Sequence, residues 1–330
     1  RFMAKYQYLV MPAKQPPTPF PGIASKPDMN LNDPAFSAMR CLGCAAKAGH
    51  KVLQTALQDA GSIARSAGAD KTFLPNIDIE SDTTELEELP PGHNLVQSVD
   101  MVSEIVSDPF ILGQISAIHA LSDIYAALAL PKSALAVINL PAASLAIQTN
   151  QLTQILAGAL MSFSEAGVKL NGGHTSEGGA LSVGFSVTGH TPNNSPITRI
   201  PANLGLNENV LVLTKPLGTG VIMAAHMRLL TKAKWVTAAI GQMTKSNQYA
   251  ASLFNSVNVI AATDITGFGL ARHALNLSKR VGAKGCVLNL RALPLLPGAL
   301  ELLTSGVRSS LHGQNREAVV IDQHMLTETP

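Results

Sequence analysis

Apolar residues recur at two spacings along the first half of the chain, and the spacing changes from segment to segment. Steps of three and four residues are typical of a helix with one buried face, whereas steps of two are typical of a strand. Segment 180–190 shows the second pattern, with Leu181, Val183, Phe185 and Val187 on one face. The expected helices are 50–68, 108–128 and 150–167, and the expected strands are 95–102, 133–140 and 180–190.

A polar, proline-rich stretch, residues 190–209, interrupts the pattern and is the expected domain boundary. Gly167, well before it, is the expected stop of the third helix. Strands and helices mixed in this way predict an α/β or α+β fold. Beyond the boundary, short apolar runs predict strands at 209–214, 257–262 and 286–290, with a helix over 270–280.

Composition narrows the class of protein. The chain of 330 residues is 46% apolar and 14% charged, which predicts a sizeable core and two domains. A net charge of +2 without a basic block argues against nucleic acid as a partner. The best candidate for a membrane span is broken by Asn139 and Pro141, so no membrane association is expected. No signal peptide is visible, and the chain begins without Met, so we expect a fragment.

The cysteines are Cys41, Cys44 and Cys286, too few for a disulfide framework. They fit a reducing compartment, so a cytoplasmic location is expected. Cys41 and Cys44 form a C-x-x-C pair, but no second pair of Cys or His lies at the spacing of a structural zinc site. Seven prolines lie between residues 11 and 34, and we expect residues 1–50 to form a flexible N-terminal segment.

Asp264 stands between a predicted strand and a predicted helix, in the sequence TDITGFG. A carboxylate at the end of a buried strand is costly to remove from water unless a partner offsets its charge. One interpretation is an aspartate that caps the following helix. The other is a metal or phosphate site, and this stretch alone does not decide between them.

Two more carboxylates lie in apolar surroundings. Asp100 is in the predicted strand 95–102, and Asp123 is in a predicted helix, four residues after His119 on the same face. A packed polar pair explains Asp123 when it is taken alone. Together with Asp264, however, the set favours a site with several Mg²⁺ ions and a polyphosphate, because Mg²⁺ takes oxygen ligands.

Glycine-rich stretches are candidates for phosphate binding. Residues 170–179, LNGGHTSEGG, are predicted to form a turn that leads into a strand. Small residues let backbone N–H groups approach an anion, but a simple tight turn explains the composition equally well. Gly218 and Gly220 in TKPLGTG offer a similar choice, with the start of a helix as the alternative. The pattern of a P-loop is absent.

Four segments, HALSDIYA, NGGHT, LTKPLGTG and TDITGFGL, follow one another in the order and spacing of a known family. Over roughly residues 40–320 the chain resembles selenophosphate synthetase (selenide, water dikinase), a family in the superfamily of aminoimidazole ribonucleotide synthetase. The most family-specific piece is C-x-x-K before KVL, here CLGCAAKAGHKVL.

The resemblance implies a role for each matching residue. Cys44 takes the catalytic position that holds Cys or selenocysteine in the family, and Lys47 takes that of the essential lysine. The metal positions fall on Asp82, Asp100, Asp123 and Asp264. The nucleotide positions fall on Lys47, on the first three of these aspartates, and on Gly172, Gly173, His174 and Thr175.

The resemblance also implies a fold of the α+β (mixed α/β) class. It is a two-domain aminoimidazole ribonucleotide synthetase-like fold, with an N-terminal barrel-forming domain and a C-terminal α/β sandwich domain. The expected domains are 51–195, for ATP binding and dimerisation, and 196–330. The family carries Asp-Pro-Gln-Thr-Ser-Gly-Gly near its C-terminus, whereas this chain ends at MLTETP, so we expect the second domain to be incomplete at its end.

The implied reaction converts ATP, selenide and water into selenophosphate, AMP and phosphate. Mg²⁺ is the implied cofactor, ATP a substrate, and K⁺ a further candidate ion. A homodimer is implied, and the selenocysteine-synthesis machinery is a candidate partner. Cys44 would either carry selenium covalently or position it, and the sequence leaves both open.

Two other functions fit part of these observations. Another ATP-using enzyme of the superfamily, acting on a nucleotide or on thiamine phosphate, would not need Cys44 three residues before Lys47. A non-catalytic paralogue that binds nucleotide and regulates a partner would tolerate the loss of either residue.

Overall fold

The structure is a computed structural model that describes residues 49–74, 84, 86–193, 209–254, 257 and 259–317. Three residues expected in the site, Cys44, Lys47 and Asp82, lie outside the described residues, as does nearly all of segment 1–50. The expectations for them therefore stay predictions.

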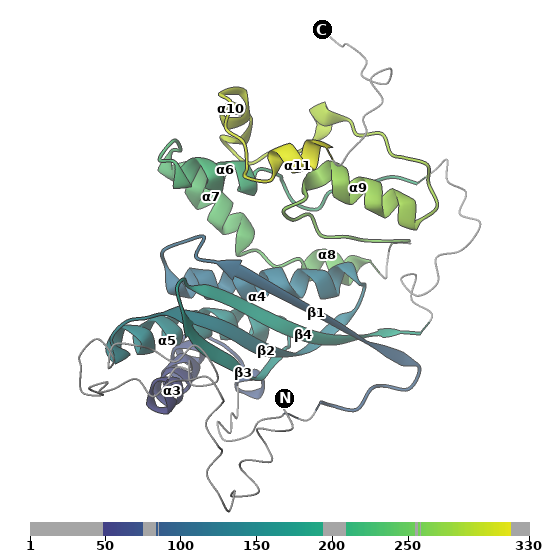
Figure 1. The fold of residues 1–330 in the computed structure, drawn as a ribbon. Helices are drawn as coiled ribbons and strands as arrows, with labels where there is room; N and C mark the ends of the chain where they lie inside the picture. Colours follow the sequence, from purple (N-terminus) through teal and green to yellow (C-terminus); the bar gives the residue numbers. More distant parts are fainter. Residues whose placement is uncertain are drawn as a thin grey trace, which may run out of the picture. The chain divides into compact units, whose positions relative to one another are not determined.

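A four-stranded sheet forms the centre of the first half of the chain, with the strand order β1-β4-β2-β3 (Figure 1). Strand β4 runs antiparallel to both of its neighbours, and β2 and β3 run parallel, so the sheet is mixed. Strands β1 and β3 are its two edges. The bounds are His93–Ser103 for β1, Leu130–Pro141 for β2, Lys169–Gly178 for β3 and Ser182–Pro192 for β4.

Helices cover one face of this sheet. Helix α4 (Pro109–Ala126) packs on β1 and β4, α5 (Leu145–Glu165) packs on α4, and α3 (His50–Ser66) packs on α5. Figure 1 shows α4 behind the sheet. The rings of Phe163 on α5 and Phe185 on β4 pack edge to face, with their centroids 4.9 Å apart. The four apolar residues expected on one face of segment 180–190 are all buried, as predicted.

Local sequence signals explain where these helices begin and end. The Asp108 carboxylate accepts hydrogen bonds from the backbone N–H groups of Phe110 and Ile111, and Pro109 is the first helical residue of α4. Gly167 follows α5 with φ +67°, a conformation that favours glycine. Its N–H bonds to the Ser164 carbonyl, which confirms the predicted stop.

The second half of the chain contains helices but, within residues 209–254 and 259–317, no strand. One isolated parallel bridge joins Leu217 to Leu295. The helices are α6 (Thr219–Met227), α7 (Ala233–Met243), α8 (Gln248–Leu253), α9 (Gly269–Arg280), α10 (Ala299–Thr304) and α11 (His312–Glu317). The short 3-10 turn η2 (Leu290–Ala292) lies between α9 and α10, and a second one, η1 (Lys71–Phe73), follows α3 in the first half of the chain. None of the described helices has the length and apolar character needed to cross a membrane.

The strands predicted at 209–214 and 286–290 are wrong, and the described part of 257–262 forms no strand either. Val210 and Val212 are 82% and 79% exposed. An apolar run becomes a strand only when a neighbouring strand accepts its backbone hydrogen bonds, so strand preference depends on tertiary partners. These segments have no such neighbour among the described residues.

Two glycines allow α4 and α5 to cross closely. A Cβ atom at Gly113 would lie 2.0 Å from the Ile155 carbonyl oxygen, and one at Gly158 would lie 2.0 Å from the Phe110 carbonyl oxygen. Both approaches are to backbone atoms, which cannot move aside without shifting a helix. The sequence therefore needs glycine at both positions for this packing.

Gly158→Ala is expected to destabilise the protein by about 3 kcal/mol, because an added methyl group overpacks the crossing. Gly61→Ala in α3 is the matched control, since its Cβ would lie no closer than 3.9 Å to the nearest atom, on Arg65. The control should stabilise by roughly 0.5–1 kcal/mol through helix propensity. Urea unfolding followed by circular dichroism measures both. Equal effects of the two substitutions would contradict the close crossing.

Candidate functional site

Three carboxylates from separate elements influence one another in the structure. Asp100 lies on β1, Asp123 on α4, and Asp264 in the loop before α9. The negative charge of Asp123 acts on both of the other two, and that of Asp264 acts on Asp100. The Ser98 hydroxyl donates to Asp123 Oδ2, and His119 Nε2 lies 3.8 Å from Asp100 Oδ2.

Burial and mutual repulsion make the ionised forms of these carboxyls unfavourable. Burial raises the pKa of Asp100 to about 6; His119 opposes this rise, and the charges of Asp123 and Asp264 add to it. Burial also raises the pKa of Asp264, Asp123 adds to the rise, and His273 and His119 oppose it. A bound cation would offset the excess negative charge, so the site has the electrostatics of a cation-binding centre.

Asp100→Asn is expected to change how stability depends on pH in the absence of metal. Because the pKa of Asp100 is 3.8 when unfolded and about 6 when folded, the folded protein keeps a proton in that window that the unfolded chain has released. Asp100 therefore stabilises the folded protein fully below its unfolded-state pKa of 3.8, and this contribution is lost as the pH rises through the folded-state pKa of about 6. Wild-type protein should lose about 1 kcal/mol relative to Asp100→Asn across this window, a figure reduced for partial exposure.

Denaturation of both proteins in EDTA, at pH values below and above the window, measures this difference. The variant is the reference at each pH, so contributions of groups that do not interact with Asp100 cancel. Parallel stability profiles would show that Asp100 titrates normally.

Asp264 does not cap the helix that follows it. Helix α9 begins at Gly269, its N-cap is Phe268, and no side chain makes a capping hydrogen bond there. Of the two interpretations of Asp264, the capping aspartate is therefore wrong. Instead, His273 in the second turn of α9 contacts this loop through both of its ring nitrogens. No sequence pattern indicated this role of His273.

The three carboxylates do not form a ready-made metal cage. In the part of the chain that the structure describes, no group of three or more His, Cys, Asp and Glu side chains is close enough to hold a metal ion. Mg²⁺ usually takes one or two carboxylates together with phosphate oxygens and waters. An oxygen-only, mutually repelling donor set such as Asp100, Asp123 and Asp264 fits that mode of binding.

The stretch expected to be a glycine-rich turn lies within strand β3. Strand β3 pairs with β2, but the register shifts after Leu170, so that Ala134 faces Leu170 and Leu135 faces Gly172. Gly172 and Gly173 have φ +157° and +155°. A Cβ at Gly173 would lie 2.2 Å from the Ala136 carbonyl oxygen. The turn is thus corrected to a bulge in an edge strand, which requires glycine.

All four residues of the expected nucleotide site, Gly172 to Thr175, line a hollow of about 870 Å³. Lys132 adds a basic side chain to its wall, Glu87 and Glu88 add acidic ones, and Leu95 and Leu135 add apolar surface. This size and mixed lining suit a nucleotide. Asp100, Asp123 and Asp264 are not among the lining residues.

Register shows how far apart the two parts of the site are. Asp100 pairs with Phe185, Phe185 with Ala136, and Ala136 with Gly173, so the two edge strands carry Asp100 and Gly173 in one row. Neighbouring strands lie about 4.8 Å apart, which separates these two backbones by about 14 Å. The structure therefore places Asp100 at one edge of the sheet and the glycines at the other.

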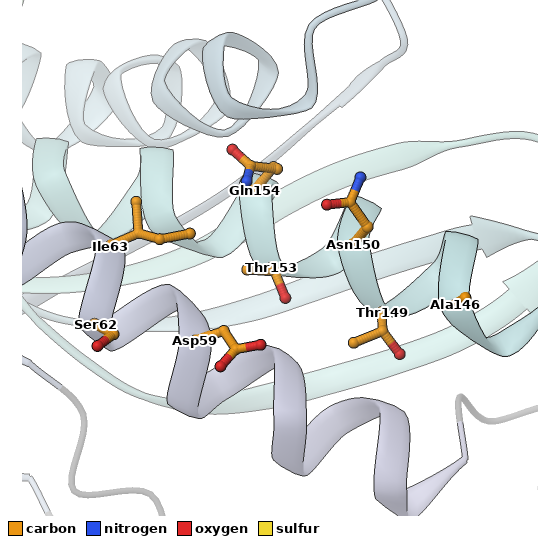
Figure 2. Close-up of a pocket in the computed structure, with 8 residues that line it drawn as sticks. All are labelled: Asp59, Ser62, Ile63, Ala146, Thr149, Asn150, Thr153 and Gln154. Carbon is orange, nitrogen blue, oxygen red and sulfur yellow. The ribbon is translucent and has the colours of Figure 1, made fainter.

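A second hollow, of about 520 Å³, lies between α3 and α5 (Figure 2). Figure 2 shows Asp59 of α3 across from Thr149 and Thr153 of α5. None of the residues proposed from the sequence lines it. It therefore adds nothing to the candidate site.

The segment TKPLGTG begins a helix, as one of its two interpretations predicted. Gly218 is the N-cap of α6, with φ +129°.

Lys215 in the same segment was not singled out from the sequence. Its amine donates to the Lys245 carbonyl oxygen, and burial lowers its pKa to about 8.

Comparison with known proteins gives matches over both halves of the chain. The family model "AIR synthase related protein, N-terminal domain" matches residues 81–191, and the corresponding C-terminal domain model matches residues 207–321. A selenide, water dikinase from Pelobacter propionicus is 36% identical over 270 residues, which are 80% of this chain and 73% of the relative. The chain belongs to the selenide, water dikinase family. A second such relative, from Geobacter metallireducens, is 35% identical over 85% of this chain and 79% of its own.

Solved structures support the fold of this family member. Thiamine-monophosphate kinase from Stenotrophomonas maltophilia superposes with a TM-score of 0.55 at 17% identity, over 80% of this chain and 81% of its own. The hydrogenase maturation protein HypE of E. coli gives 0.53 at 14% identity, over 79% and 85%. The predicted two-domain aminoimidazole ribonucleotide synthetase-like fold, of mixed α/β class, is confirmed.

Proposed function

We propose that this protein makes selenophosphate from selenide, ATP and water, and releases AMP and phosphate. The observation that carries the proposal is the similarity to selenide, water dikinases, four of which are 34–36% identical over 80–85% of the chain. The clustered carboxylates and the nucleotide-sized hollow are consistent with it.

Each part of the proposed site has a distinct task. Asp100, Asp123, Asp264 and Asp82 would hold Mg²⁺, which when bound offsets the charge of the phosphates. The open backbone at Gly172 and Gly173 would let the nucleotide approach strand β3 closely. Phosphoryl transfer depends mainly on positioning and charge neutralisation. Lys47 would add a cation near the phosphates, and Cys44 would handle selenium.

A second copy of the chain is the proposed partner. On the open face of the sheet, edge strand β1 exposes Leu95, Val99 and Met101. Apolar surface of this kind is typical of an interface. A dimer formed there would cover the hollow, whose wall includes Leu95. A cytoplasmic location, K⁺ as an additional ion and contact with the selenocysteine-synthesis machinery complete the proposal.

The decisive experiment is ATP turnover by the complete protein with and without selenide, with AMP and ADP resolved. We expect AMP production that requires selenide. ADP production independent of selenide would instead indicate another ATP-using enzyme of the superfamily. ATP binding without turnover under either condition would indicate a regulatory paralogue.

A further inference from the structure

His273 contacts the Asp264 loop on both sides of the aspartate. Its Nε2 lies 3.3 Å from the backbone nitrogen of Thr266, and its Nδ1 lies 3.5 Å from the Thr263 hydroxyl oxygen. The same Thr263 hydroxyl donates to the carbonyl oxygen of Asp264, at 3.2 Å. One imidazole ring thus connects helix α9 to the residue before Asp264 and to the second residue after it.

The directions of these hydrogen bonds follow from chemistry. A backbone N–H can only donate, so Nε2 must accept from Thr266 and carries no hydrogen. In a neutral imidazole the hydrogen is then on Nδ1, which donates to the Thr263 oxygen. That oxygen is left free to donate its own hydrogen to the Asp264 carbonyl. Nε2 also lies 3.4 Å from the Thr266 hydroxyl oxygen, which can donate a second hydrogen bond to the unprotonated nitrogen.

Other side chains brace the loop at its ends rather than around the aspartate. Asn315 Nδ2 donates to the Gly267 carbonyl at 2.8 Å, and Arg280 donates to the Ala262 carbonyl at 3.5 Å. His273, by contrast, reaches the residues on both sides of Asp264. The backbone around Asp264 therefore depends on this ring for its path.

We propose that His273, with a hydrogen on Nδ1 and Nε2 as an acceptor, is a positioning residue that fixes the Asp264 loop and so aims the Asp264 carboxylate at the metal and the phosphates. This inference rests on the proposed function, since it assigns Asp264 to metal and nucleotide. Partners that orient a metal ligand commonly change metal affinity ten- to a hundredfold when they are lost.

The first test is binding of a non-hydrolysable ATP analogue, titrated with Mg²⁺ in a calorimeter. His273→Leu removes all contacts of the ring nitrogens with Thr263 and Thr266 and should raise the half-saturating Mg²⁺ concentration about tenfold. His273→Gln keeps an oxygen acceptor near the position of Nε2 and should stay within about threefold of wild type. Asn276→Ala, an exposed position on the same helix, is the control and should change nothing.

Thr263→Val is a second route to the same answer, because valine keeps the shape of threonine without its hydroxyl. Like His273→Leu, it should raise the half-saturating Mg²⁺ concentration. If His273→Leu fails to fold, the result for Thr263→Val alone tests the positioning role. Equal behaviour of His273→Leu, Thr263→Val and wild type would overturn the positioning role. Equal losses in the Gln and Leu variants would also overturn it.

The second test does not involve ATP. Long-range ¹H–¹⁵N correlation spectra of histidine-labelled protein distinguish Nδ1–H from Nε2–H, and the His273→Gln spectrum assigns the signal. We expect Nδ1–H at neutral pH, and an Nε2–H signal would overturn the inference. A different result would overturn the proposed function instead: wild-type protein that has Nδ1–H on His273 but shows no Mg²⁺-dependent nucleotide binding. Asp264 would then have no metal or phosphate toward which to be positioned.

Discussion

Cys44→Ala is expected to reduce selenophosphate formation to background while leaving ATP affinity nearly unchanged. A thiolate contributes nothing to holding a triphosphate, so its loss should affect the selenium step alone. Lys47 lies three residues further along the chain, and its positive charge favours the thiolate form of a nearby cysteine. The measurement is selenide-dependent AMP production in the complete protein, together with calorimetry of ATP binding.

Cys41→Ala is the matched control, because it removes the other cysteine of the C-x-x-C pair. It should retain activity, since Cys41 does not match the catalytic position of the family. Lys47→Ala should lose turnover and also bind ATP more weakly, because a cation near the phosphates is removed. Full activity of Cys44→Ala would exclude the proposed role. Equal losses in both cysteine variants would favour a redox pair instead.

Elements of the first half of the chain were predictable because their signals are local. Burial of one face sets the spacing of Leu181, Val183, Phe185 and Val187, and this spacing alone identifies a strand. Gly167 ends α5 because few other residues adopt its positive φ. Signals of this kind need no knowledge of distant residues.

Features that depend on pairing were not predictable from local sequence. The run at 209–214 has the composition of a strand, but nothing in it says whether a neighbouring strand exists. The glycines at 172 and 173 indicate unusual backbone, but a turn and a bulge require the same residue type. Only the register with β2 distinguishes these two possibilities.

The candidate site shows the same division. A shared site for Asp100, Asp123 and Asp264 was expected from carboxylates in apolar surroundings, and in the structure these carboxylates lie within electrostatic range of one another but are not close enough to form a metal cage. The contacts of Ser98 and His273 follow from the path of the chain, which no motif encodes. The roles of these residues, and the domain limits 51–195 and 196–330, stay predictions.

Asp264→Asn is expected to weaken Mg²⁺-dependent binding of an ATP analogue at least tenfold, the scale on which metal-site substitutions act. The amide has nearly the shape of the carboxylate but lacks its charge, so the phosphates and metal lose one neutralising ligand. Asp100 and Asp123 should not compensate, because β1 and α4 fix them independently of the α9 loop. Calorimetry with Mg²⁺ and with EDTA gives both affinities.

Unfolding does not offer an alternative explanation of such a loss. Burial raises the pKa of Asp264, so its ionised form is unfavourable in the folded protein, and the neutral amide should leave stability equal or higher. Asp59→Asn in the hollow between α3 and α5 is the matched control, since it removes one aspartate charge away from the carboxylate cluster. The control should bind like wild type. If Asp264→Asn also bound equally well, or if binding needed no metal, the assignment of Asp264 would be wrong.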